Sequence, residues 1–330
     1  MSSFVAVTGA EGFIGSHLTE ELVARGHRVR AMVQYNSFGS RGWLDRLGHD
    51  TLEGVEIEAG DVRDPGSVAS LLDGVDVVCH LAALIAIPYS YVAPRSYVDT
   101  NVTGTLNVLE AVRRLGIGRL VHTSTSEVYG TARTVPIDET HPLQAQSPYA
   151  ASKVAADKLV ESYHLSFGLP AVTLRPFNTY GPRQSARAII PTVISQIAAG
   201  ERAIHLGSLS PTRDFNFATD TAAAFCALVE ADDEIHGRTF NAGSGTEISI
   251  GELVVEIGQT MGVDVDVSCD AERVRPEASE VQRLVADSIE LRMATSWKPQ
   301  VDLTAGLART ARWFTDPENL AQYRTAEYAI

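Results

Sequence analysis

Cysteine is scarce in this chain, with only three among 330 residues. The three stand far apart, and no two have the spacing of metal ligands; they are Cys79, Cys226 and Cys269. A small, odd number of thiols excludes a disulfide framework and is typical of a reducing compartment. We therefore expect buried structural thiols and no metal centre.

Positive charge and long apolar runs are also in short supply. Lysine and arginine number 27 against 41 acidic residues, which gives a net charge of -14. This surplus argues against nucleic acid or an anionic membrane as a partner. No run of roughly 18 apolar residues occurs, and residues 1–10 lack a basic and apolar leader pattern. We expect a cytoplasmic protein in which an anionic substrate is bound by a local cluster of arginines.

Glycines early in the chain predict a dinucleotide site. The apolar residues 4–7 are followed by glycines at positions 9, 12 and 15 and then by a helical pattern. Glycines after a strand let the backbone turn tightly and let a pyrophosphate approach the helix N-terminus. The predicted cofactor residues of this turn are Gly9, Gly12, Phe13, Ile14 and Gly15.

The second predicted strand, residues 28–33, lacks the acidic residue that usually follows it in NAD-binding folds and binds the ribose 2′-hydroxyl. Amide and hydroxyl side chains and one arginine stand there instead: Gln34, Asn36, Ser37 and Arg41. An arginine with such donors can accept a 2′-phosphate. The sequence therefore leaves NAD and NADP as equal alternatives.

Three further strands are predicted at residues 55–62, 75–83 and 119–125, with a long helix at residues 96–115. Strands that alternate with helices in this way predict an α/β fold with a Rossmann-type, doubly wound parallel sheet, whose ligands bind beyond the carboxyl ends of the strands. Asp61 is a candidate for the adenine amino group. The other predicted cofactor residues of these segments are Val62, Leu81, Ala82, Ala83, Asn101 and Thr123.

A tyrosine and a lysine four residues apart, Tyr149 and Lys153, open a later helix. Ser147 suits the N-cap and Pro148 the first turn, so both side chains fall on one face. An ammonium close to a phenol lowers the phenol pKa, which gives a base able to take a proton from a sugar hydroxyl. Two hydroxyls and a carboxylate follow the fifth predicted strand; they belong to Thr125, Ser126 and Glu127.

These motifs together resemble the extended short-chain dehydrogenase/reductase superfamily, in its nucleotide-sugar branch. The resemblance runs from the N-terminus to about residue 300 and rests on the glycine pattern, residues 81–83, Asn101, Thr125, Tyr149, Lys153 and residues 175–182. It implies that Tyr149 is the acid and base at the sugar 4-hydroxyl, that Lys153 binds the nicotinamide ribose and that Thr125 orients the 4-hydroxyl. It also implies a tightly bound NAD or NADP that is regenerated in each cycle, and a homodimer that pairs helices near residues 97–115 and 149–167.

Three segments within that branch resemble the nucleotide-activated N-acetylglucosamine 4,6-dehydratases of legionaminic acid biosynthesis, some of which prefer a GDP sugar: residues 34–38, 83–91 and 178–187. The resemblance implies oxidation at C4, removal of the C5 proton by Glu127, loss of hydroxide from C6 and return of hydride to C6. Many such dehydratases carry Asp where this chain has Ser126, so Ser126, a water or Glu127 itself is the acid at C6. The alternatives are a UDP-glucuronate decarboxylase, a 4-epimerase, which would leave Glu127 unused, and a dinucleotide-sensing protein without enzymatic activity.

The regular alternation of strand and helix ends after residue 175. We predict an NAD(P)-binding domain over residues 1–175 and a smaller, interleaved C-terminal substrate-binding domain over residues 176–330, with residues 214–245 returning to the sheet. Guanidinium groups bind phosphate bidentately, so arginines gathered in this half of an acidic protein predict a diphosphate site. The predicted substrate-binding residues are Ala86, Asn178, Arg183, Arg187, Arg213 and Arg275.

Overall fold

Seven parallel strands form the main sheet of the computed structural model, which describes residues 2–269, 277–321 and 323. The strand order is β3-β2-β1-β4-β5-β6-β11, and every neighbouring pair is parallel. The strands are β1 (Phe4–Thr8), β2 (Arg28–Gln34), β3 (Val55–Gly60), β4 (Val77–His80), β5 (Arg119–Thr123), β6 (Ala171–Pro176) and β11 (Thr239–Ala242). The predicted α/β fold with a Rossmann-type doubly wound sheet is confirmed.

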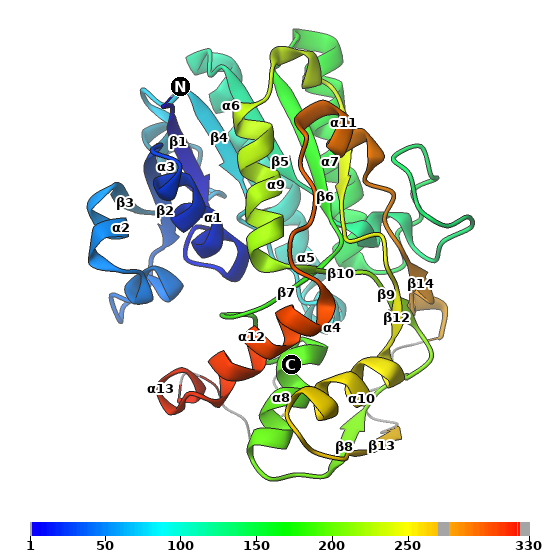
Figure 1. Ribbon diagram of the computed structural model, residues 1–330. Coiled ribbons are helices and arrows are strands. Elements are labelled where there is room, and N and C mark those ends of the chain that lie inside the picture. Colours follow the sequence, from blue (N-terminus) through cyan, green and yellow to red (C-terminus); the bar gives the residue numbers. More distant parts are fainter. Residues whose placement is uncertain (1, 270–276, 322, 324–330) are drawn as a thin grey trace.

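Helices cover both faces of the sheet (Figure 1), because its inner strands are apolar on both sides. Val5 and Val7 pack in the core below one helix layer, whereas Ala6 between them packs in the core below the other. The first layer contains α1 (Phe13–Ala24) and α9 (Ala218–Glu230), which pack on each other. The second layer contains α3 (Pro65–Leu72), α6 (Gly104–Leu115) and α7 (Pro148–Phe167).

A second group of elements lies beyond the carboxyl ends of the sheet strands, in the lower part of Figure 1. It has its own apolar core, formed among others by Ile194, Leu253 and Phe314. Its helices are α8 (Ile189–Ala198), α10 (Ile250–Thr260), α12 (Leu303–Thr315) and α13 (Pro317–Leu320). Its strand pairs and small sheets are formed by β7 (Asn178–Tyr180) with β10 (Phe215–Phe217), β8 (Ala203–Leu206) with β13 (Asp266–Cys269), and β9 (Thr212–Arg213) with β12 (Ile248–Ser249) and β14 (Arg283–Leu284).

Short helices complete the described chain: α2 (His49–Glu53), α4 (Ile87–Val92), α5 (Pro94–Tyr97) and α11 (Ile289–Thr295). The helix predicted over residues 96–115 is interrupted, because the π-helical turn η2 (Val98–Thr103) separates α5 from α6. The strand predicted over residues 75–83 ends at His80. The backbone N–H of Leu81 still donates to the Thr8 carbonyl of β1, and the N–H groups of Leu81 and Ala82 both donate to the Thr8 hydroxyl. Within the described residues, no helix combines the length and apolar character needed to cross a membrane.

An aromatic cluster joins the segment after β2 to the second group of elements. Trp43, in the short helix η1 (Gly42–Arg46), contacts the ring of Trp313 on α12 edge to face at 5.5 Å. The Tyr323 ring lies 6.0 Å from each of these tryptophans, and its hydroxyl donates to the carbonyl of Gln184 at 2.9 Å. We refer to Trp43, Trp313 and Tyr323 as the aromatic clasp.

Late residues of the chain return to the sheet, since β11 pairs with β6 along its outer edge. The helix before it, α9, covers α1 from the first part of the chain. The division into domains at residue 175 stays a prediction.

Candidate active site

The glycine turn between β1 and α1 has no space for a side chain at Gly9 or at Gly15. Gly9 has φ +69°, and a Cβ there would meet backbone atoms of Ala82 at 2.9 Å. A Cβ on Gly15 would lie 2.1 Å from the carbonyl oxygen of Gly9. Gly12 is the N-cap of α1 and supplies no side-chain cap, so the first N–H groups of that helix are available to an anion. This turn therefore fits the pyrophosphate of a dinucleotide.

The carboxyl end of β4 is fixed by a buried chain of hydrogen bonds. The Thr8 hydroxyl lies 2.8 Å from Nδ1 of His80, and Nε2 of His80 lies 3.1 Å from the hydroxyl of Thr105. Burial holds the pKa of His80 well below its usual range. His80 is thus a core histidine. The half-buried residues 81–83 after it lie beside the glycine turn.

Asn101 connects this strand end to α7. Its side chain accepts from the backbone N–H of Leu84, donates to the carbonyl of Leu84 at 2.9 Å and donates to the hydroxyl of Ser152 at 2.9 Å. The Ser152 hydroxyl in turn donates to the carbonyl of Tyr149. Asn101 is 1% exposed and lies in the π-helical turn, a distortion frequent at functional sites. Asn101 thus bonds the segment after β4 to α7.

The α7 helix begins as predicted, with the Ser147 side chain accepting from the N–H of Ala150. Tyr149 and Lys153 are both buried on its inner face. The Lys153 amine donates to the carbonyl of Thr123 at 2.5 Å, and burial lowers the pKa of Lys153 to about 8.

Tyr149 differs from the prediction in the direction of its pKa shift. Burial raises the pKa of the Tyr149 phenol, and the Thr125 hydroxyl, which hydrogen-bonds it, acts in the opposite direction. The Lys153 amine is directed at the Thr123 carbonyl, and desolvation of the Tyr149 phenol outweighs the expected effect of the ammonium. The expected lowering of the Tyr149 pKa is therefore wrong.

The turn after β5 places its carboxylate beside Tyr149. Thr125 caps the short helix η3 (Ser126–Tyr129), and its side chain accepts from the N–H of Glu127 at 3.2 Å. Glu127 is half-buried and raises the pKa of Tyr149 by its negative charge. Ser126 is 2% exposed. The structure thus brings Thr125, Glu127 and Tyr149 together.

A buried ionic network that the sequence reasoning missed lies behind this group. Asp157 accepts from the Ser124 hydroxyl at 2.8 Å and from the guanidinium of Arg175 at 3.0 Å. Arg175 also donates to the Tyr129 hydroxyl, which donates to the side chain of Asn241. The network joins η3, β6, α7 and β11 to Ser124, the residue after β5. The signal for it was the position of Asp157 four residues after Lys153. We refer to these residues as the Asp157 network.

The predicted substrate residues occupy different environments. Asn178, on β7, has a buried side-chain nitrogen without a hydrogen-bond partner in the described structure. Arg213 is buried and forms an ion pair with Glu280 at 3.2 Å. Burial raises the pKa of the Tyr97 phenol, and the positive charge of Arg187 acts on that pKa in the opposite direction. The Tyr97 ring contacts the Tyr149 ring edge to face.

Two predicted substrate residues bond within the chain, and one cannot be placed. Arg183 donates to Glu20 and Ser16 of α1, at 2.6 and 3.3 Å, which joins residue 183 to the helix of the glycine turn. The carbonyl of Ala86 accepts from the Tyr97 hydroxyl. Arg275 lies outside the described residues.

The polar side chains in the loop after β2 and at the end of β3 form hydrogen bonds and ion pairs with residues close to them in the sequence. The Asn36 side chain bonds to backbone groups of its own loop. Arg41 donates to Asp45 at 2.7 Å, and Asp61 pairs with Arg63 at 2.5 Å. The arginine expected to meet a 2′-phosphate therefore already has a carboxylate partner.

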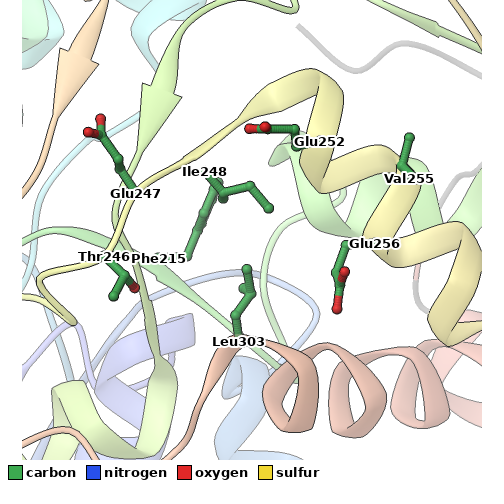
Figure 2. A pocket seen from close by; sticks show the side chains of 8 residues that line it. All are labelled: Phe215, Thr246, Glu247, Ile248, Glu252, Val255, Glu256 and Leu303. Atoms are coloured by element: carbon green, nitrogen blue, oxygen red, sulfur yellow. The ribbon is translucent and has the colours of Figure 1, made fainter.

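A cavity of about 550 Å³ lies elsewhere, between α10 and the start of α12 (Figure 2). Its lining residues are Phe215, Thr246, Glu247, Ile248, Glu252, Val255, Glu256 and Leu303. Each of its three carboxylates has a partner inside the chain: Glu247 pairs with Arg283, Glu252 accepts from Ser249, and Glu256 accepts from Thr304. This cavity contains none of the predicted catalytic side chains and has the wrong charge for a diphosphate.

Comparisons with known proteins agree with this geometry. Residues 6–310 match the family model described as GDP-mannose 4,6 dehydratase. The chain is 34% identical over 313 residues to a UDP-glucose 4-epimerase of Mycolicibacterium smegmatis, covering 93% of this chain and 97% of that one. It is 33% identical to a dTDP-glucose 4,6-dehydratase of Xanthomonas campestris pv. campestris, covering 96% and 94%.

A solved structure is similar along almost the whole chain. It is DesIV, a dTDP-glucose 4,6-dehydratase from Streptomyces venezuelae, with NAD and TYD bound. The TM-score is 0.86 at 29% identity, with 98% of this chain and 100% of that chain covered. The chain belongs to the extended short-chain dehydrogenase/reductase family of NAD-dependent nucleotide-sugar 4,6-dehydratases and 4-epimerases.

Proposed function

We propose that this protein is a nucleotide-sugar 4,6-dehydratase that converts a GDP- or UDP-activated N-acetylglucosamine into its 4-keto-6-deoxy derivative and water. The observation that carries the proposal is the carboxylate of Glu127 beside Tyr149. A 4-epimerase needs an acid and base only at the 4-hydroxyl, whereas dehydration also needs a base for the C5 proton. The N-acetyl group and the GDP or UDP carrier rest on the sequence resemblance.

A nicotinamide dinucleotide fits the residues on this side of the sheet. The glycine turn has room for a pyrophosphate, and the Thr123 hydroxyl, buried without a partner among the described residues, is an available donor beside Lys153. When bound, this cofactor supplies the acceptor for the hydride of C4 and later its return to C6. NAD is the form bound by the similar DesIV structure. NADP is the alternative indicated by Arg41 and by the missing acidic residue after β2.

The protein residues divide the proton transfers between them. Thr125 orients the sugar 4-hydroxyl, and Tyr149 takes its proton. Because burial raises the pKa of Tyr149, the phenolate forms only when positive charge is close, and Lys153 is the cation of this helix face. The resulting 4-ketone acidifies the C5 hydrogen, and Glu127 removes it. Hydroxide leaves C6 with a proton from Ser126, a bound water or Glu127, so that one water is lost in total.

In this proposal, the second group of elements binds the nucleoside diphosphate part of the substrate. The unpartnered side-chain nitrogen of Asn178 is a donor for a phosphate oxygen. The guanidinium of Arg213, held by Glu280, supplies positive charge in the same group of elements. These contacts support binding of a nucleoside diphosphate and leave its base open.

Mass spectrometry of four incubations tests the proposal. The purified protein is incubated separately with GDP-N-acetylglucosamine, UDP-N-acetylglucosamine, UDP-glucuronate and GDP-mannose. We expect loss of one water from one of the two N-acetylglucosamine nucleotides. Loss of water from GDP-mannose alone would keep the reaction and overturn the substrate. If no mass changes, NMR of the same samples reports epimerisation, which would overturn the dehydratase.

A second candidate is decarboxylation of UDP-glucuronate. The observation in its favour is Arg187, whose charge acts on Tyr97 next to Tyr149 and could pair with a sugar carboxylate. Loss of carbon dioxide from UDP-glucuronate in the same experiment would establish this reaction instead.

We also infer a homodimer that pairs α6 and α7 with their copies. Support comes from apolar side chains at the ends of these adjoining helices: Leu165 is 77% exposed, Phe167 58% and Leu115 38%. Size-exclusion chromatography with light scattering should give twice the mass of the chain. A monomer mass for the wild type would overturn the inference, and Leu165→Asp should weaken the dimer.

A further inference from the structure

We infer that Glu11, within the glycine turn, is the carboxylate that binds the adenine ribose and makes the site selective for NAD over NADP. The inference rests on the proposed function only in requiring a dinucleotide cofactor. It takes its first support from an absence in the sequence: β2 ends at Gln34, and no acidic residue follows before Asp45.

The Glu11 side chain occupies the place where that acidic residue is missing. Its Oε1 accepts from the backbone N–H of Gln34 at 2.9 Å, so the carboxylate lies at the carboxyl end of β2. Ligands of a doubly wound sheet bind at this edge. The Glu11 carboxylate, from the turn after β1, thus takes the position of the acidic residue that usually follows β2.

The second oxygen of the Glu11 carboxylate lacks a hydrogen-bond partner among the described residues. Oε2 of Glu11 is buried and has no hydrogen-bond partner in the described part of the chain. Buried acceptors are nearly always satisfied, and an orphan one requires an explanation. A ribose hydroxyl is a donor of the right kind, since an ionised carboxylate is an acceptor only.

The backbone around Glu11 is held on two sides. Its carbonyl accepts from the N–H of Trp43 at 3.0 Å, and a Cβ on Gly42 would lie 2.6 Å from that carbonyl oxygen. The Glu11 side chain is therefore bonded to β2 and its backbone carbonyl to η1. A shift of this residue would also move Trp43 of the aromatic clasp. A fixed negative charge at this position repels a 2′-phosphate.

The nearby arginine does not reverse this preference. Arg41 donates to Asp45 through its side chain, and its backbone N–H donates to the same carboxylate at 2.8 Å. A 2′-phosphate would have to compete with Asp45 for Arg41 and would also meet Glu11. The carboxylates of Glu11 and Asp45 therefore both favour a dinucleotide whose adenine ribose carries a 2′-hydroxyl over one that carries a 2′-phosphate.

Competition between the two dinucleotides tests the inference without any sugar substrate. Wild-type protein is equilibrated with equal concentrations of NAD⁺ and NADP⁺, freed of unbound nucleotide and analysed by mass spectrometry after denaturation. We expect at least about tenfold more bound NAD than NADP, and a fall of this ratio by about tenfold or more in Glu11→Gln. Glu11→Gln keeps an acceptor for the N–H of Gln34, so the strand end stays bonded.

Two variants separate recognition from structure. Glu21→Gln removes an equal charge from α1, where Glu21 pairs with Arg25, and should keep the wild-type ratio. Glu11→Ala, which also loses the bond to Gln34, should lower the melting temperature as well as the ratio. An unchanged ratio in folded Glu11→Gln, or a wild-type protein that prefers NADP or binds neither dinucleotide, would overturn the inference. None of these readouts depends on dehydration, so failure of the proposed reaction would be seen separately.

Discussion

In the proposed mechanism, Glu127 is the side chain that separates 4,6-dehydration from 4-epimerisation. If it is the base at C5, Glu127→Gln should slow water loss by about 100-fold to 10,000-fold, the usual contribution of a positioned base. C4 oxidation should survive, because Tyr149 and Thr125 are intact, and reduced nicotinamide should accumulate in stopped-flow absorbance. Tyr149→Phe should remove both signals.

The control for this experiment is a carboxylate on the outside of the catalytic helix. Glu161 is exposed and pairs with Lys158, so Glu161→Gln should keep the wild-type rate. A Glu127→Gln protein that eliminates water at the wild-type rate would refute the role of Glu127.

Lys153 has a consequence for stability that depends on pH. Burial lowers its pKa from 10.5 to about 8 in the folded protein. Between those pH values the unfolded chain binds more protons than the folded one, so this side chain lets stability rise with pH through the window and costs stability below pH 8. A shift of this size corresponds to about 3 kcal/mol.

Replacing the amine removes that dependence. The stability of the wild type relative to Lys153→Met should rise by up to about 3 kcal/mol between pH 7 and pH 10, measured by urea unfolding of both proteins at each pH. Lys158→Met, at an exposed position of the same helix, is the control and should show no such change. A constant difference between wild type and Lys153→Met would show that the amine is not desolvated.

At the scale of elements, the Asp157 network determines how α7 sits on the sheet. Asp157 is 5% exposed and bonds to Ser124 and Arg175, so its loss leaves a buried guanidinium without its carboxylate. Asp157→Asn should lower the free energy of unfolding by about 3–5 kcal/mol. Because Ser124 precedes Thr125, the variant should also slow turnover.

Urea unfolding and steady-state rates of the same preparations check this prediction. Asp45→Asn breaks the exposed ion pair between Arg41 and Asp45 of η1 and should cost about 1 kcal/mol or less. Equal losses in both variants would mean that the Asp157 network does not stabilise α7.

Elements with local causes were predictable from the sequence. The glycine turn and the start of α7 depend on backbone sterics and on capping by Ser147, which act within a few residues. The Asp157 network was not predictable, because Arg175 and Asn241 reach it from β6 and β11. The pKa of Tyr149 was predicted in the wrong direction because a spacing of four residues indicates a neighbour but not the degree of burial.

At the scale of the whole molecule, the aromatic clasp joins the segment after β2 of the main sheet to α12 of the second group of elements. Trp43 follows β2 and contacts α12, and its backbone N–H donates to the carbonyl of Glu11, so it links the proposed ribose-binding residue to the second group of elements. Trp43→Ala should lower the melting temperature by several degrees, since loss of half-buried aromatic contacts costs about 1–2 kcal/mol. It should also speed the release of bound NAD, measured by dilution.

Another aromatic residue of the same loop provides the comparison. Tyr35 is 77% exposed, and Tyr35→Ala should change neither the melting temperature nor the release of NAD. If Trp43→Ala retains NAD as long as the wild type does, the clasp stabilises the fold without guarding the cofactor.

The seventh strand has a consequence for how the protein is made. β11 pairs with β6, and α9 covers α1, yet both are encoded more than forty residues after β6 ends. The first six strands of the sheet therefore leave the ribosome before β6 has its partner strand β11 and before α1 has its partner helix α9. Unpaired edges are templates for association between chains. During synthesis, we expect the nascent chain to depend on chaperones until residues 218–242 have left the exit tunnel.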